Sequence, residues 1–163
     1  MAFRRSYKQL VIFSLLICLV LFSGTQAATT VSDVYDQPTS LKISQTSNHK
    51  FTITISEPVE EGETLTIIFP SAFDMSSIVE NDVDIADDST DLTTASDCTG
   101  TDQASVTVTS DILTITICAG DGGAIASGSV VIIEIGTNAS ASGGGTNKIT
   151  NPTTAGTYFI GID

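Results

Sequence analysis

"KFTITIS", residues 50–56, decides the fold class of this 163-residue chain. Its apolar members, Phe51, Ile53 and Ile55, alternate with threonines and a serine. Successive side chains of a β-strand point to opposite faces of a sheet, so the stretch predicts a strand with one face on a core. The β-branched residues that fill most of its positions favour a strand as well.

The same period of two recurs in four later stretches: residues 63–69, 105–109, 112–118 and 129–136. Turn-forming residues separate these stretches, and residues 109–111 are few enough to close a hairpin. The best helix candidate after the N-terminal leader is the short run 71–79, which is worth two turns at most. We therefore expect an all-β, antiparallel β-sandwich of seven to nine strands, with a barrel as the alternative.

Two weaker segments are expected to complete the sandwich. A strand is predicted near residues 41–46, ahead of a turn that contains His49. Residues 157–162 carry apolar side chains on both faces, which predicts a closing strand inside a sheet.

The first 27 residues have the organisation of a secretory signal peptide. Arg4, Arg5 and Lys8 precede an apolar run from Leu10 to Phe22, and small residues follow that run. The run is shorter than the roughly 20 residues that a spanning helix needs. We expect residues 1–27 to form a signal-peptide helix that is removed before Ala28, with a retained signal anchor as the alternative.

Removal of the leader leaves one domain, residues 28–163, with a strongly acidic composition. It holds three lysines against all 19 acidic residues of the chain, a formal net charge of −16. Such a surface repels nucleic acid and anionic lipid, so we expect no nucleic-acid partner and no membrane contact after cleavage. The domain is expected to be secreted or displayed on the cell surface. We expect it to be the first module of a longer chain, with a complete single-domain protein as the alternative.

Two cysteines remain after the leader, Cys98 and Cys118. An even pair in an exported chain predicts a disulfide, with two buried thiols as the alternative. The pair flanks the expected hairpin, whose two arms bring its ends together.

Acidic residues are densest in "ENDVDIADDSTD", residues 80–91. Calcium takes six to eight oxygen ligands, several of them carboxylates in a flexible loop. A calcium site is therefore one hypothesis, and solvated loop charges are the other. The candidate ligands are Asp82, Asp84, Asp87 and Asp88.

The chain has few residues of the types that catalytic sites usually contain. His49 is the sole histidine, and its expected place in a turn favours a structural role over that of a catalytic base. The mature part has no tryptophan and few aromatics to line a sugar-binding cleft. We expect no enzymatic activity and no cofactor other than calcium.

Six motifs together resemble Ig-like β-sandwich modules of bacterial secreted and cell-surface proteins. They are "NHKFTITI" (48–55), "EGETLTIIFPSAFD" (61–74), "VDIADD" (83–88), "DCTG" (97–100), "LTITICAGDGGAIASGSVVIIEIGTNA" (113–139) and "ITNPTTAGTYFIGI" (149–162). The resemblance implies a structural or adhesive role, with other surface proteins or glycans as partners. The alternative is a calcium-dependent module that binds a glycan or a protein. The resemblance implies no catalytic residues.

Overall fold

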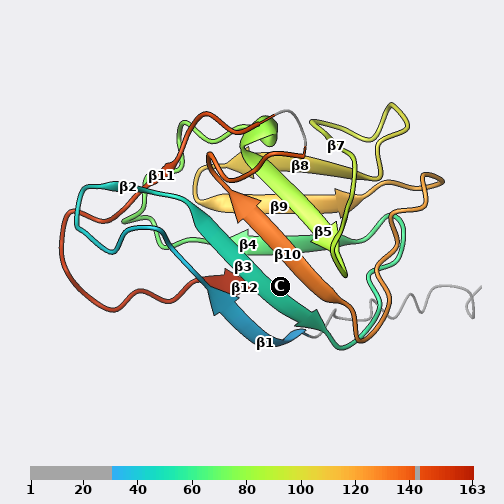
Figure 1. Ribbon diagram of the computed structural model, residues 1–163, viewed down its shortest axis with the longest axis horizontal. Coiled ribbons are helices and arrows are strands. Elements are labelled where there is room, and N and C mark those ends of the chain that lie inside the picture. The colour runs from blue at the N-terminus through green and yellow to red at the C-terminus, as the bar shows by residue number, and fades with distance from the viewer. Residues whose placement is uncertain (1–30, 142–143) are drawn as a thin grey trace, which may run out of the picture.

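The computed structural model describes residues 31–141 and 144–163, which form two facing five-stranded sheets (Figure 1). The strands of the front sheet run diagonally across those of the rear sheet in this view. The expected signal peptide, residues 1–27, lies outside the described residues.

The front sheet has the strand order β1-β3-β10-β5-β6. These strands are β1 (Val31–Asp36), β3 (His49–Ile55), β10 (Val130–Ile135), β5 (Val83–Asp87) and β6 (Thr90–Asp91). The rear sheet has the order β12-β4-β9-β8-β7. These strands are β12 (Gly161–Ile162), β4 (Thr64–Ile68), β9 (Ile112–Ile117), β8 (Ala104–Thr109) and β7 (Thr94–Ala95). A separate pair joins β2 (Thr46–Ser47) to β11 (Ile149–Thr150), and one 3-10 helix, η1 (Glu80–Asp82), precedes β5.

The all-β sandwich predicted from the sequence is confirmed. Of the twelve strands in the described residues, five have two residues and seven have five to seven residues. All pairs are antiparallel except β7 with β8. Counted over the long strands alone, β3 is flanked by the first and the seventh, whereas the second strand of an immunoglobulin constant domain is flanked by the first and the fifth. The two-layer architecture is shared with that fold and the strand order differs.

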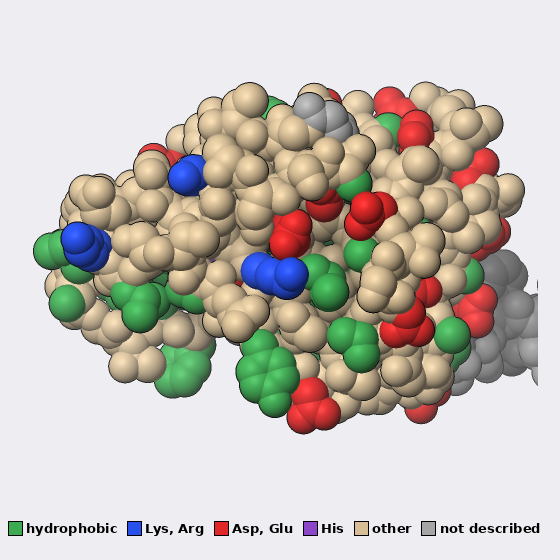
Figure 2. All heavy atoms as spheres, in the orientation of Figure 1, with side chains coloured by type: hydrophobic (Ala, Val, Ile, Leu, Met, Phe, Trp, Pro, Cys, Tyr) green, Lys and Arg blue, Asp and Glu red, His purple; other side chains and the backbone are tan. Residues whose placement is uncertain are grey.

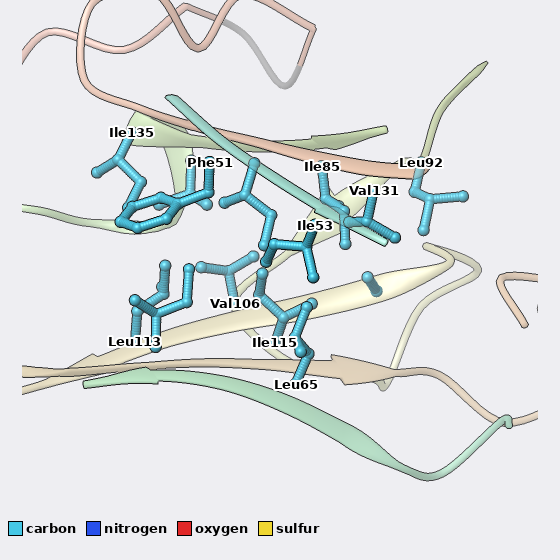
Figure 3. Packing of buried hydrophobic residues seen from close by; sticks show 14 of the residues in the cluster. Phe51, Ile53, Leu65, Ile85, Leu92, Val106, Leu113, Ile115, Val131 and Ile135 are labelled. Atoms are coloured by element: carbon cyan, nitrogen blue, oxygen red, sulfur yellow. The ribbon is translucent and has the colours of Figure 1, made fainter. Parts of the chain in front are cut away.

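The core lies between the two sheets and is built from the alternating apolar residues. Figure 3 shows side chains of β3 and β10 pointing toward those of β4, β8 and β9. Among the predicted inward residues of these strands, Val108 is partly buried and packs against the core. The others are at most 2% exposed: Phe51, Ile53, Ile55, Leu65, Ile67, Val106, Leu113, Ile115, Ile117, Val131, Ile133 and Ile135. The period of two therefore identified the core correctly.

One expected strand is wrong, and the helix candidate does not form a helix. Residues 41–45 form bends and turns, with Leu41 86% exposed and Ile43 52% exposed, and strand pairing begins only at Thr46. Residues 71–79 form turns instead of a helix, and the sole helical turn in the described residues is η1. Short apolar runs have no period strong enough to separate strand, helix and packed loop.

The C-terminal segment forms a strand over only two residues. Gly161 and Ile162 pair with Ile68 and Ile67 at the edge of the rear sheet. Residues 157–160 are unpaired, and Phe159 is 86% exposed. The predicted closing strand is therefore a short edge strand and not an internal one.

Within the described residues, no helix has the length and apolar character needed to cross a membrane.

Substitution in β3 tests the two-faced pattern. Ile53 is fully buried, so Ile53→Ala is expected to lower the free energy of unfolding by about 2–5 kcal/mol through lost burial and a residual cavity. Thr54 is the matched control on the opposite face, and Thr54→Ala is expected to cost under about 1 kcal/mol. Chemical denaturation of both variants measures the difference; equal losses would contradict the assignment of faces.

Candidate functional site

The acidic segment 80–91 is divided among several structural elements. Asp82 ends η1, Asp84 and Asp87 lie on β5, and Asp88 follows β5 in the turn to β6. Asp82 and Asp84 are buried, whereas Asp88 is exposed. The alternation that buries Val83 and Ile85 toward the core turns Asp84 to the outer face of the sheet.

Asp82 is a buried carboxylate that accepts four hydrogen bonds. Its Oδ1 accepts from the backbone N–H groups of Thr146 (2.7 Å) and Asn147 (2.8 Å). Its Oδ2 accepts from the Asn147 side chain (2.9 Å) and from the Val79 backbone N–H (3.0 Å). Burial raises the pKa of Asp82, but these hydrogen bonds together outweigh burial and hold its pKa below the ordinary value of 3.8. Asp82 thus fixes residues 146–147 against the start of η1.

The neighbouring aspartates also accept hydrogen bonds from the chain. Asp84 Oδ2 accepts from the backbone N–H of Ala141, in the same connection that Asp82 holds. Asp88 Oδ1 accepts from the Val130 backbone N–H at 2.8 Å, which ties the turn after β5 to the start of β10. These carboxylates anchor loops to strands.

The described residues contain no group of three or more His, Cys, Asp or Glu side chains arranged to hold a metal ion. Calcium binding at Asp82, Asp84, Asp87 and Asp88 stays a prediction. A calcium ion at Asp82 would have to compete with four N–H donors for the same two oxygens.

Cys98 and Cys118 form a disulfide, as the sequence predicted. Cys118 follows β9 and is buried, while Cys98 lies in the exposed excursion between β7 and β8. The backbone N–H of Cys118 also donates to Gln103 O at 2.9 Å, so the far end of the same excursion is fixed to the same place. The bond therefore holds an irregular segment against the rear sheet.

The sequence predicted that His49 lies in a turn, and this prediction is wrong. His49 is the first residue of β3 and is 2% exposed. Its ring lies among Phe51, Phe69 and Phe73, with a centroid distance of 5.4 Å to Phe69. Its Nδ1 is 2.9 Å from Asp36 Oδ2. The alternation of β3, extended two residues back from Phe51, was the sequence signal that places this ring inward.

The His49–Asp36 pair is not joined to a nucleophile. In a hydrolytic triad the second imidazole nitrogen bonds the hydroxyl or thiol that it activates. Here His49 Nε2 is buried and has no hydrogen-bond partner among the described residues, and the same holds for Asp36 Oδ1. The pair is therefore a polar contact at the edge of the core that leaves one buried polar atom on each side chain without a partner among the described residues.

Comparison of the chain with models of known protein families, with curated proteins and with solved structures finds no match.

Acidification and substitution at Asp82 test its anchoring role. Asp82→Asn places an NH₂ group against two N–H donors, so we expect a loss of about 2–4 kcal/mol in unfolding free energy at neutral pH. Because the folded-state pKa is lowered, the stabilisation by ionised Asp82 is present above about pH 4 and is lost as the pH falls through the folded-state pKa. Urea denaturation across pH 2–7 measures both effects. Asp91→Asn, an exposed change in the same acidic stretch, is the control; an equal loss in both variants would refute the anchor.

Removal of the disulfide tests its contribution to stability. The double variant Cys98→Ala/Cys118→Ala is expected to lose about 3 kcal/mol, because the bond closes a loop with a sequence separation of 20 residues. Thermal and denaturant unfolding of the variant and of the reduced wild-type protein should agree. Mass spectrometry after alkylation checks the premise: two alkylated thiols in the exported wild-type protein would show that the bond does not form.

Proposed function

We propose that residues 28–163 form a secreted or cell-surface module, Ig-like in its two-sheet architecture, with a structural or adhesive role and no catalytic activity. The observation that carries the proposal is the bond between Cys98 and Cys118. Disulfides persist in oxidising compartments, which include the cell exterior and the bacterial periplasm. The signal-peptide pattern of residues 1–27 supports export in the same direction.

The surface charge supports the choice of partner. Figure 2 shows acidic side chains spread over one face of the molecule, with few cations among them. Of the three lysines in residues 28–163, Lys50 is paired with Glu134 at 3.3 Å. Repulsion of polyanions favours other surface proteins or glycans as partners over nucleic acid.

Exposed apolar side chains support an adhesive contact at one end of the sandwich. Leu41 and Ile43 border the same pocket and are 86% and 52% exposed. Figure 2 shows hydrophobic side chains at the end of this face where β2 and β11 lie in Figure 1. Clustered exposed apolar residues with a polar surround are characteristic of contact surfaces.

Adhesion of coated beads tests this role. Beads that carry the purified domain are expected to bind arrays of extracellular proteins or glycans, and Leu41→Ser/Ile43→Ser is expected to reduce binding several-fold without lowering the melting temperature. Val79→Ser, at another exposed apolar position, is the control and should bind as the wild type does.

Three other outcomes would contradict the proposal or replace it. Equal binding by the double variant and the wild type would remove this end of the molecule from the contact. Binding that EDTA abolishes and calcium restores would support the calcium-dependent module instead. Turnover of a hydrolase substrate by the purified domain would contradict a non-catalytic role.

A further inference from the structure

A pocket of about 330 Å³ lies at the end of the sandwich where β3 begins. Asp36 and His49 line it from β1 and β3, and the connection after β1 contributes Leu41. The segment between β11 and β12 supplies another wall, which includes Tyr158 and Ile160. The volume is at the lower end of the range of small-molecule sites, so it suits a small ligand or a single side chain.

Asp36 is an acidic group in this pocket without a complete set of partners. Its side chain is 21% exposed, its Oδ2 contacts His49, and its Oδ1 is buried with no hydrogen-bond partner among the described residues. No lysine or arginine lines the pocket. A largely buried carboxylate is costly unless a cation or several donors satisfy it.

His49 occupies only one oxygen of the Asp36 carboxylate. Its Nδ1 is 2.9 Å from Asp36 Oδ2. His49 Nε2 is a second buried polar atom with no hydrogen-bond partner among the described residues. A ligand with N–H or O–H donors can pair with the remaining oxygen, Asp36 Oδ1.

A β-bulge turns Asp36 toward this pocket. Val31 pairs with Ile55 and Asp36 pairs with Phe51, so β1 contains one residue more than β3 between these two pairs. Ile55 and Phe51 both face the core, and residues opposite each other in a pair share a face. Without the extra residue, Asp36 would lie on the outer face. Bulges are frequent next to functional sites because they redirect a side chain in this way.

We propose that this pocket binds a primary ammonium group on a short apolar stem, either a free amine or the side chain of a lysine. The ammonium supplies a positive charge and N–H donors for Asp36. The stem packs against Leu41 and against the rings of Phe73 and Tyr158. Those two aromatic rings also favour a cation. This site does not depend on the adhesive role proposed above, because a small amine can bind whether or not a macromolecule does.

Entry of the ligand requires a shift of the wall at residues 153–160. Asp36 Oδ1 and His49 Nε2 are both shielded from solvent in this structure. Residues 153–160 make no backbone hydrogen bond to any other described residue, and the Tyr158 hydroxyl bonds Thr154 O within the same segment. The wall is thus held by side-chain packing alone and can move without breaking a sheet.

Titration of the ¹⁵N-labelled domain with n-butylamine, followed by NMR, tests the proposal. We expect saturable shifts confined to residues around the pocket, and an affinity that rises roughly fourfold for each methylene from ethylamine to pentylamine. n-Butyrate, with the opposite charge, should produce no such shifts. A capped peptide with one lysine is the second arm: saturable shifts at the same residues would assign the site to lysine side chains, and shifts with the free amine alone would assign it to small amines.

Asp36→Asn is the informative variant, because asparagine keeps the size of the side chain and can still accept from His49 Nδ1. It is expected to weaken amine binding about tenfold or more, since a charge-assisted contact is lost. Glu57→Gln removes one exposed negative charge elsewhere and should bind as the wild type does. The ¹⁵N spectrum of each variant confirms that it is folded.

Two results would overturn the site. One is the absence of saturable shifts with every amine. The other is weak binding spread over the acidic surface that ignores chain length, is equal in Asp36→Asn and Glu57→Gln, and disappears with salt.

Discussion

The structure depends on which side chains of β3 point into the core. This strand pairs with β1 on one side and β10 on the other, so its register sets both neighbours. A slip of one residue would turn Phe51, Ile53 and Ile55 to solvent and bring threonines into the core, which makes the register strongly specified. The same alternation carries His49 inward at the start of the strand, so the core and the pocket follow from one pattern.

The acidic residues of this chain are of two kinds, those on the surface and those buried in hydrogen-bonded positions. Most lie on the surface, where their negative charge repels polyanions. Asp82 is different, because it is buried and its two oxygens accept four hydrogen bonds from two separate segments. Close packing surrounds it: a Cβ on Gly145 would lie 3.2 Å from the Asp82 Cα and would overlap Gly136 O. In its described residues, 136–141 and 144–148, the connection from β10 to β11 has no strand or helix and is fixed by a buried carboxylate and a glycine.

Sequence periodicity predicted the central strands well because burial on one face leaves a signal in every second residue. It identified the inward residues of β3, β4, β8, β9 and β10, and the even pair of cysteines identified the disulfide. It failed at residues 41–46 and 157–160, where apolar side chains have another use. The pocket at the end of the sandwich is lined by apolar residues from both segments, Leu41 and Ile43 from the first and Tyr158 and Ile160 from the second. Their hydrophobicity therefore comes from the pocket wall and does not indicate a strand.

The alternation of apolar and polar residues along the strands does not reveal the pocket. Asp36 faces inward only because β1 contains one extra residue between its pairs with β3, and Asp33 in this stretch has φ = 48°. Aspartate adopts the left-handed backbone conformation more readily than most residues. One aspartate among 19 acidic residues is nevertheless too common a feature to predict a β-bulge. The pairing of Asp36 with His49 is likewise a contact between two strands, set by register, and neither residue carries a local pattern for it. A bulge that places a carboxylate and an imidazole at the edge of an apolar core has a cost in unsatisfied acceptors. The proposed ammonium ligand would offset part of that cost by donating hydrogen bonds to Asp36, and the β-bulge in β1 is the feature that turns this carboxylate toward the pocket.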